Sequence, residues 1–275
     1  MAVKPPAMKK VCKELVALNR IVKQAGEGVM GLYEARAFES HQKADNTPAT
    51  GADALADAII RKGILGISGV PILSEEQETF SLWDGTCWVV DPLDGTKNFM
   101  RGEKDFCIMA GLLEHGKPAM GCVYVPAKKE LLFAQKGKGA YVQKDGGRVR
   151  KLEVSKECKF GKYSVVLSKN HLKQKELSFA KFLGVKKISH IGSVGIKLGE
   201  IAAGRAQLYI NFDGLNVWDV CAPQIILEEA GGSVFDANGK ELQYLQKRFR
   251  NGIIATNGKC REEIVAKMRE FGSGL

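Results

Sequence analysis

The sequence contains no apolar run long enough to cross a membrane. Its longest apolar stretches, such as residues 106–113, are too short and too interrupted, whereas a transmembrane helix needs about 20 apolar residues. The first ten residues carry lysines and prolines with no apolar core after them, so we expect no secretory signal. These two absences favour a protein of the cytoplasm.

Cysteine pairs with a recognisable spacing are also missing. The seven cysteines are dispersed, with no CxxC pair and no spacing typical of a zinc site. An odd and scattered set of cysteines fits buried free thiols better than a disulfide framework. Free thiols indicate a reducing compartment, which again favours the cytoplasm.

A basic arm is the third missing feature. The chain has 275 residues, 45% of them hydrophobic, and a formal net charge of +10. Its lysines are spread along the whole sequence, and no stretch interleaves basic with aromatic residues. The positive charge is either an ordinary solvated surface or the sign of an anionic partner. Among anionic partners we expect a small phosphate ester rather than a nucleic acid.

Apolar periodicity predicts an α/β protein in which helices cover sheets. The expected helices cover residues 9–36, 52–64, 172–183, 193–203, 220–230 and 261–271. The expected strands cover residues 71–73, 88–90, 107–113, 119–125, 130–134, 164–168, 206–210 and 253–255. A chain of this length forms one large domain or two intimate lobes. We expect two lobes in one compact unit, residues 1–150 and 151–275, with most acidic candidates in the first.

Acidic residues concentrate where predicted strands end or predicted helices begin. The acids at these places are Asp53, Glu75, Glu76, Asp91, Asp94 and Asp219. In α/β folds, ligands bind outside the ends of strands. Carboxylates that lie close together repel one another and resist burial, and carboxylate oxygens are ligands that Mg²⁺ prefers. A magnesium site would therefore explain the cluster.

The segment DPLDGT at residues 91–96 combines two of these acids with a sharp bend. Pro92 fixes its own backbone and biases Asp91 towards an extended conformation, and Gly95 permits a turn that other residues resist. A helix that begins at Gly95 would offer free N–H groups to a phosphate. Taken singly, each acid has an ordinary explanation as a turn residue, a surface charge or a helix cap. Their joint occurrence favours the metal site.

These residues resemble the signature of the inositol monophosphatase superfamily, the lithium-sensitive, magnesium-dependent phosphatases. The segments that carry the resemblance are SEE at 74–76, DPLDGT at 91–96, WD at 218–219 and EAGG at 229–232. Within the superfamily, the chain looks most like a bacterial-type 3′(2′),5′-bisphosphate nucleotidase. The segments that carry this second likeness are 43–48, 94–97, 168–171 and 191–197.

The resemblance implies a layered α-β-α-β-α sugar-phosphatase fold with two or three Mg²⁺ ions per active site. The implied metal ligands are Glu76, Asp91, the Leu93 carbonyl, Asp94 and Asp219. The implied catalytic dyad, which would take a proton from the attacking water, is Asp53 with Thr96. The implied substrate contacts are Gly95, Thr96, Ser168, His171, Ser193, Lys197 and Asp219.

The implied activity is hydrolysis of 3′(2′)-phosphoadenosine 5′-phosphate to AMP and phosphate, in sulfur assimilation. The sulfated analogue would be a second substrate, and lithium an inhibitor. The alternatives are an inositol monophosphatase or fructose-1,6-bisphosphatase of the same superfamily, or a non-catalytic RNA- or protein-binding member. We expect a monomer or homodimer. One departure from the family pattern is Pro223, which we expect in the first turn of the helix at 220–230, where proline is tolerated.

Overall fold

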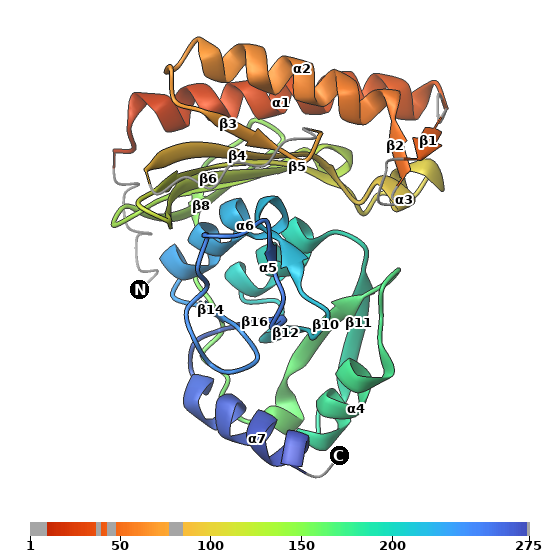
Figure 1. Ribbon diagram of the computed structural model, residues 1–275, viewed down its shortest axis with the longest axis vertical. Helices are drawn as coiled ribbons and strands as arrows, with labels where there is room; N and C mark the ends of the chain where they lie inside the picture. Colours follow the sequence, from red (N-terminus) through yellow and green to blue (C-terminus); the bar gives the residue numbers. More distant parts are fainter. Residues whose placement is uncertain (1–9, 37–39, 43–47, 77–84, 274–275) are drawn as a thin grey trace.

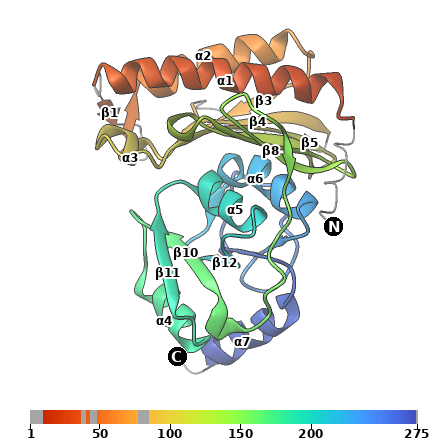
Figure 2. The same ribbon diagram turned by 180° about the vertical axis from the view of Figure 1, so that it is seen from behind.

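The computed structural model describes residues 10–36, 40–42, 48–76 and 85–273, and these form alternating layers of helices and sheets (Figure 1). Helices α1 and α2 cover one face of a seven-stranded sheet. Helices α5 and α6 lie between this sheet and a five-stranded sheet, whose far face is covered by α4 and α7 (Figures 1 and 2). The α-β-α-β-α layering implied by the resemblance is confirmed.

Each boundary between layers has its own cluster of buried apolar side chains. Leu18 and Ile60 belong to the cluster beneath α1 and α2. Leu198 and Ile225 belong to the central cluster between the two sheets, and Phe179 to the one beneath α4 and α7. Because both faces of both sheets are covered, inner strands such as β5 and β12 are buried along almost their whole length.

The outer helices α1 (Lys13–Glu34) and α2 (Gly51–Leu65) match the expected helices. The start of α2 also orients Asp53, one of the predicted catalytic residues. Thr50 caps the helix, because its hydroxyl accepts the N–H of Ala52 (3.1 Å). In return, the Thr50 N–H and hydroxyl both donate to Oδ2 of Asp53, each at 2.7 Å. One oxygen of the buried Asp53 carboxylate is thereby held, and Oδ1 stays available to other partners.

The seven-stranded sheet has the order β3-β4-β5-β6-β7-β8-β9. Its strands are β3 (Ile72–Ser74), β4 (Thr86–Asp94), β5 (Cys107–Glu114), β6 (Lys117–Val125), β7 (Glu130–Gln135), β8 (Gly139–Lys144) and β9 (Arg150–Lys151). Among the strands that the structure describes in this sheet, only β3 and β4 pair in parallel. Strand β4 extends past the expected strand 88–90 as far as Asp94, and the short helix α3 (Thr96–Met100) follows it.

The five-stranded sheet has the order β11-β10-β12-β16-β14. Its strands are β10 (Ser164–Ser168), β11 (Lys187–Ile191), β12 (Leu208–Asn211), β14 (Ser233–Phe235) and β16 (Ile253–Thr256). Its helices are α4 (Gln174–Phe182), α5 (Val194–Ala202), α6 (Val217–Glu229) and α7 (Arg261–Ser273). The remaining elements are β1 (Ser40–Gln42), β2 (Pro48–Thr50), β13 (Leu215–Asn216), β15 (Arg248–Phe249), η1 (Pro126–Lys128) and η2 (Phe160–Lys162).

The position of Pro223 corrects the sequence analysis. Helix α6 begins at Val217 with Asn216 as its N-cap, so Pro223 lies inside the helix, and its predicted place in the first turn was wrong. The error came from taking Asp219 as the residue that opens the helix. The Asp219 carboxylate instead accepts the N–H of Asn216 (2.7 Å) from within the first turn. Since proline has no N–H, the Asp219 carbonyl loses its usual helical donor.

Three other expectations concern the chain as a whole. No helix within the described residues is long and apolar enough to cross a membrane. Residues 43–47, part of a segment that supports the nucleotidase likeness, lie outside the described residues. The division into two lobes at residue 150 stays a prediction. In chain order, β9 is the last strand of the seven-stranded sheet, and β10 is the first strand of the five-stranded sheet.

Candidate active site

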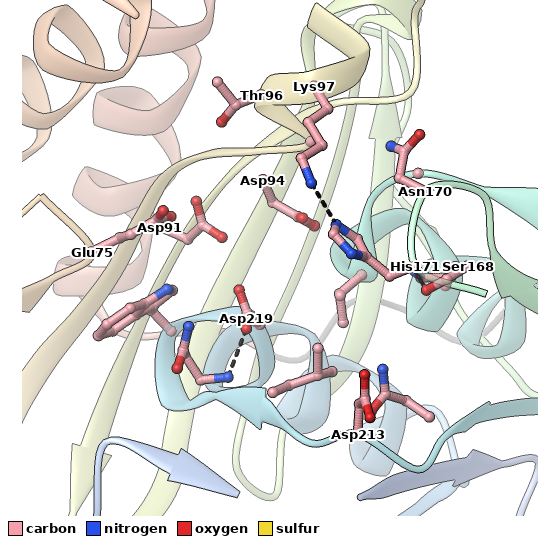
Figure 3. Close-up of a pocket in the computed structure, with 18 of the residues that line it drawn as sticks. Glu75, Asp91, Asp94, Thr96, Lys97, Ser168, Asn170, His171, Asp213 and Asp219 are labelled. Carbon is pink, nitrogen blue, oxygen red and sulfur yellow. Dashed lines mark hydrogen bonds between the residues drawn. The ribbon is translucent and has the colours of Figure 1, made fainter. Parts of the chain in front are cut away.

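A cavity of about 270 Å³ lies where the ends of both sheets meet (Figure 3). Its lining comes from the ends of β3 and β4, from α3, from the ends of β10 and β12 and the segments that follow them, from β13 and β15, and from the starts of α5 and α6. The acidic residues that line it are Glu75, Asp91, Asp94, Asp213 and Asp219, and the basic ones are Lys97, His171, Lys197 and Arg248. The cavity therefore collects charges of both signs from segments far apart in sequence.

Four carboxylates face one side of the cavity (Figure 3). Strands β3 and β4 pair in parallel with Ser74 opposite Val90, and the N–H of Glu75 donates to the Val90 carbonyl (3.1 Å). This pairing brings Glu75 beside Asp91. The ladder of β4 is irregular between Asp91 and Asp94, a distortion that re-aims side chains. Asp219 reaches the same space from the first turn of α6.

Burial and mutual repulsion raise the pKa values of these acids. The pKa of Asp91 lies well above its usual range, first because of burial and then because of Glu75, Asp94 and Asp219. The pKa of Asp219 is also raised well above its usual range, by burial and then by Asp94 and Glu75. Such a cluster favours a bound cation, because a positive charge offsets both costs.

Asp94 is held by the start of α5. Its Oδ2 accepts the hydroxyl of Ser193 (2.6 Å) and the N–H of Gly195 (2.8 Å). Burial raises the pKa of Asp94, although these two hydrogen bonds and the charge of Lys197 act to lower it. With Oδ2 engaged in this way, Oδ1 is the oxygen that Asp94 can offer to a ligand.

The structure brings Asp53 and Thr96 together, as the resemblance implied. The Thr96 Oγ1 lies 3.0 Å from Oδ1 of Asp53 and 3.0 Å from the Leu93 carbonyl oxygen. Gly95, just before α3, has a φ of 101°. A Cβ at this position would stand 2.6 Å from the Asp105 carbonyl oxygen, so only glycine fits without rearrangement. The bend at Gly95 thereby brings the Thr96 hydroxyl within hydrogen-bonding distance of Asp53.

Lys97, Ser168 and His171 lie across the cavity from Glu75 and Asp91, and the carboxylate of Asp213 lies on the same side as they do (Figure 3). Lys97 donates to Nε2 of His171 (3.3 Å), and the pKa of His171 is lowered by desolvation and then by Lys97 and Lys197. Lys197 is only 1% exposed. Its ammonium donates to the Ser168 hydroxyl (3.0 Å) and lies 4.9 Å from the ring centre of Tyr209. We call Lys97, Ser168, His171 and Lys197 the basic wall.

Two of the predicted site residues, Glu76 and Ser193, are not among the residues that line the cavity. Glu75 lines the cavity and Glu76 does not, because the N–H of Glu75 continues the pairing with β4, whereas that of Glu76 turns back to the Ser74 hydroxyl (3.3 Å). Glu75 therefore replaces Glu76 in the ligand set that we propose. Ser193 is 0% exposed and does not line the cavity. It orients Asp94, and the contact between Ser193 and a substrate stays a prediction.

Other polar residues that line the cavity were not predicted from the sequence, among them Asn170, Asp213 and Arg248. Asn170 precedes His171, and Asp213 lies in the segment after β12, where its carboxylate pairs with Lys173 (3.1 Å). Arg248 of β15 donates to the carbonyl of Asp213 (3.2 Å). All three lie in or beside loops without a periodic pattern, and only the folded chain brings them to the cavity.

The donor set fits Mg²⁺. It offers carboxylate oxygens and the Leu93 carbonyl, with no thiol or imidazole among them, and hard oxygen ligands are those that Mg²⁺ takes. Within the described part of the chain, no three acidic, histidine or cysteine side chains already surround a common point as metal ligands do. The identity and number of the metal ions stay a prediction.

The raised pKa values predict how pH changes the stability gained from magnesium. Carboxyls with a raised folded pKa stabilise the fold below their unfolded pKa of about 3.9 and lose this contribution as pH rises through the folded pKa. Since Mg²⁺ replaces the lost protons, we expect it to raise the melting temperature more at about pH 8 than at about pH 5. Thermal unfolding with Mg²⁺ and with EDTA tests this. An equal gain at both pH values would contradict it.

Comparison with known families gives one match over almost the whole chain. Residues 12–273 match the inositol monophosphatase family. The chain is 35% identical over 231 residues to the 3′(2′),5′-bisphosphate nucleotidase CysQ of Escherichia coli K12, an alignment that covers 82% of this chain and 91% of that protein. It is 32% identical over 185 residues to the fructose-1,6-bisphosphatase/inositol-1-monophosphatase of Thermotoga maritima, with 66% and 68% covered.

Solved structures agree with the sequence matches. CysQ of Bacteroides thetaiotaomicron, a bacterial member of the inositol monophosphatase family, aligns with a TM-score of 0.75 at 30% identity, over 89% of this chain and 97% of that one. The IMPase of Thermotoga maritima aligns with a TM-score of 0.81 at 26% identity, over 96% and 99%. The relatives thus include nucleotidases and a fructose-1,6-bisphosphatase/inositol-1-monophosphatase.

Proposed function

The chain belongs to the inositol monophosphatase family, and from this premise we propose that it hydrolyses 3′(2′)-phosphoadenosine 5′-phosphate to AMP and phosphate. The family and the curated relatives make it a phosphatase, a hydrolase of phosphate esters. The finer choice of a bisphosphorylated nucleotide is our proposal. It is supported by the likeness to CysQ nucleotidases and by the distribution of charge in the cavity.

The single observation that carries the proposal is the two-sided charge of the cavity. Carboxylates that can hold cations gather on one side, and the basic wall stands on the other (Figure 3). A ligand with a single phosphate can place that group either on the cation side or on the basic wall, but not on both. A nucleotide with a 3′-phosphate and a 5′-phosphate could place one group on the cation side and the other on the basic wall.

Glu75, Asp91, Asp94, Asp219 and the Leu93 carbonyl would hold the magnesium ions. When bound, Mg²⁺ supplies positive charge that makes a water more acidic and stabilises the phosphoryl group in transfer. The chain orients this ligand set beforehand. Asp94 is fixed by Ser193 and Gly195, and Asp219 by the N–H of Asn216.

Asp53 and Thr96 form the proton path. The Thr96 hydroxyl donates to Oδ1 of Asp53 at 3.0 Å, which leaves a lone pair on Oγ1 to accept a proton from the attacking water. The proton of Thr96 can then pass to Asp53. Thr50 holds the other oxygen of this carboxylate through two hydrogen bonds of 2.7 Å, so Oδ1 stays directed at Thr96.

The basic wall would hold the second phosphate. Burial lowers the pKa of Lys197 to about 8, against the opposing pull of Asp94 and Asp219, so most molecules carry the charge at neutral pH. Lys97 and Lys197 can each donate to a phosphate oxygen, and Ser168 lies within reach through its contact with Lys197. Backbone N–H groups at Gly95 and Thr96 are the proposed seat of the phosphate that is removed.

Further parts of the proposal follow from the likeness to the nucleotidases. We propose that the sulfated analogue is also a substrate, that lithium inhibits the enzyme and that it works in sulfur assimilation. The proposed partner is a small phosphate ester, the proposed location is the cytoplasm, and the proposed state is a monomer or homodimer.

A panel of three substrates tests the proposal. With Mg²⁺ present, we expect the highest kcat/KM for adenosine 3′,5′-bisphosphate, ahead of inositol 1-phosphate and fructose 1,6-bisphosphate, and a loss of activity on adding lithium. Phosphate release under identical conditions is the measurement. A higher kcat/KM for the inositol or fructose ester would overturn the choice of substrate.

A further inference from the structure

Residues 168–171, which include Ser168 and His171 of the basic wall, contact α3 and the loop after it directly. Lys169 pairs with Glu103 (2.8 Å). The two residues that follow Lys169, Asn170 and His171, also accept hydrogen bonds from this part of the chain. Arg101 donates to Oδ1 of Asn170 (2.7 Å), and Lys97 to His171 (3.3 Å). Three consecutive residues of the segment after β10 thus contact the segment that begins at Thr96.

The deepest of these contacts joins two asparagine side chains. Asn98, in α3, is 0% exposed. Its Oδ1 accepts Nδ2 of Asn170 (2.8 Å), and its Nδ2 donates to the Asp105 carbonyl (2.8 Å). A guanidinium can only donate and a carbonyl can only accept. Arg101 at one end and the Asp105 carbonyl at the other therefore fix the orientation of both amides.

Burial separates this bridge from the contacts beside it. Lys169 and Glu103 are 38% and 30% exposed, and exposed ion pairs of this kind contribute little. Gly192 lies against the Asn98 amide so closely that a Cβ there would stand 1.5 Å from Nδ2. The Asn98 end of the bridge is thus buried, whereas Asn170 is half-buried. A shift of either amide would leave the buried Oδ1 of Asn98 without its donor.

We propose that Asn98 and Asn170 are positioning residues that set the distance between Thr96 and the basic wall. This inference rests on the proposed function, because the distance matters only for a substrate with two phosphates. Asn98 is two residues from Thr96, and Asn170 lies between Ser168 and His171. Asn98 does not line the cavity, so it acts through Asn170 and not through contact with a substrate.

The variants Asn98→Ala and Asn170→Ala test the bridge. For each, we expect kcat/KM for adenosine 3′,5′-bisphosphate to fall by about 30-fold, mainly through KM, because a displacement of about 1 Å is enough for such a loss. For adenosine 3′-monophosphate, which cannot use both sides, we expect a change within about twofold in Asn98→Ala, because the Asn98 side chain does not line the cavity. The double variant should lose no more than either single variant, since both break one contact.

The control is Lys169→Ala, which removes an exposed contact from the same segment and should leave both substrates within about twofold of the wild type. If circular dichroism shows that Asn98→Ala does not fold, the variant Asn98→Ser takes its place. If kcat/KM falls equally for both substrates, the positioning role is wrong, but the proposed function still stands. The same holds if Asn170→Ala loses kcat/KM and the Asn98 variant does not. A wild type with no preference for the bisphosphate would overturn the proposed function and this inference together.

Discussion

Asp94→Asn is expected to abolish magnesium-dependent phosphate release while leaving the fold intact. The Gly195 N–H and the Ser193 hydroxyl both reach Oδ2 of Asp94. In the variant, the amide oxygen must take this place, because an amide NH₂ would face the N–H of Gly195, donor against donor. The NH₂ group then points to where Oδ1 offers an electron pair to Mg²⁺. We expect kcat to fall by about 10³-fold or more.

The same substitution should not weaken the metal-free protein. Removing one of four neighbouring negative charges relieves repulsion that raises the pKa values of Asp91 and Asp219. We therefore expect an unchanged or higher melting temperature in EDTA and a smaller gain on adding Mg²⁺. Unchanged turnover in Asp94→Asn would rule out this residue as a metal ligand.

Thr96→Val is the substitution with the second largest expected effect. Valine keeps the branched shape of threonine but removes the hydroxyl that links the attacking water to Asp53. We expect kcat to fall by about 10²- to 10³-fold, in the range of general base catalysis, with little change in KM. The fold should lose about 1 to 3 kcal/mol, because the buried Asp53 carboxylate loses a hydrogen-bond donor. Single-turnover phosphate release and thermal unfolding measure the two effects.

Thr96→Ser is the matched control, because serine keeps the hydroxyl and lacks only the methyl group. It should retain kcat within about tenfold of the wild type. If the valine and serine variants lose the same activity, the hydroxyl does not carry the proton, and the dyad of Asp53 and Thr96 is wrong.

Long periodic elements of this fold could be predicted from the sequence. Helices α1 and α2 and strands β5 and β10 lie where apolar spacing places them, because each buries one continuous face or both faces. Strand β11 was missed, since its residues alternate without a fully buried face. Strand β14 was missed as well, because three residues after two glycines carry too little pattern.

The candidate site was predictable as a set of acids but not in its geometry. The choice between Glu75 and Glu76 depends on the register of β3 against β4, which sequence does not reveal. The part played by Ser193 depends on how α5 meets the end of β4, a contact between segments 99 residues apart. The bridge between Asn98 and Asn170 is hidden for the same reason, since neither residue has a pattern around it.

The most direct test of the account compares two substrates that differ by one phosphate. The wild-type enzyme with Mg²⁺ should hydrolyse adenosine 3′,5′-bisphosphate with a kcat/KM about 100-fold above that for adenosine 3′-monophosphate, because only the former engages both sides of the cavity. Equal kcat/KM values for the two nucleotides would contradict the claim that the basic wall recognises a second phosphate.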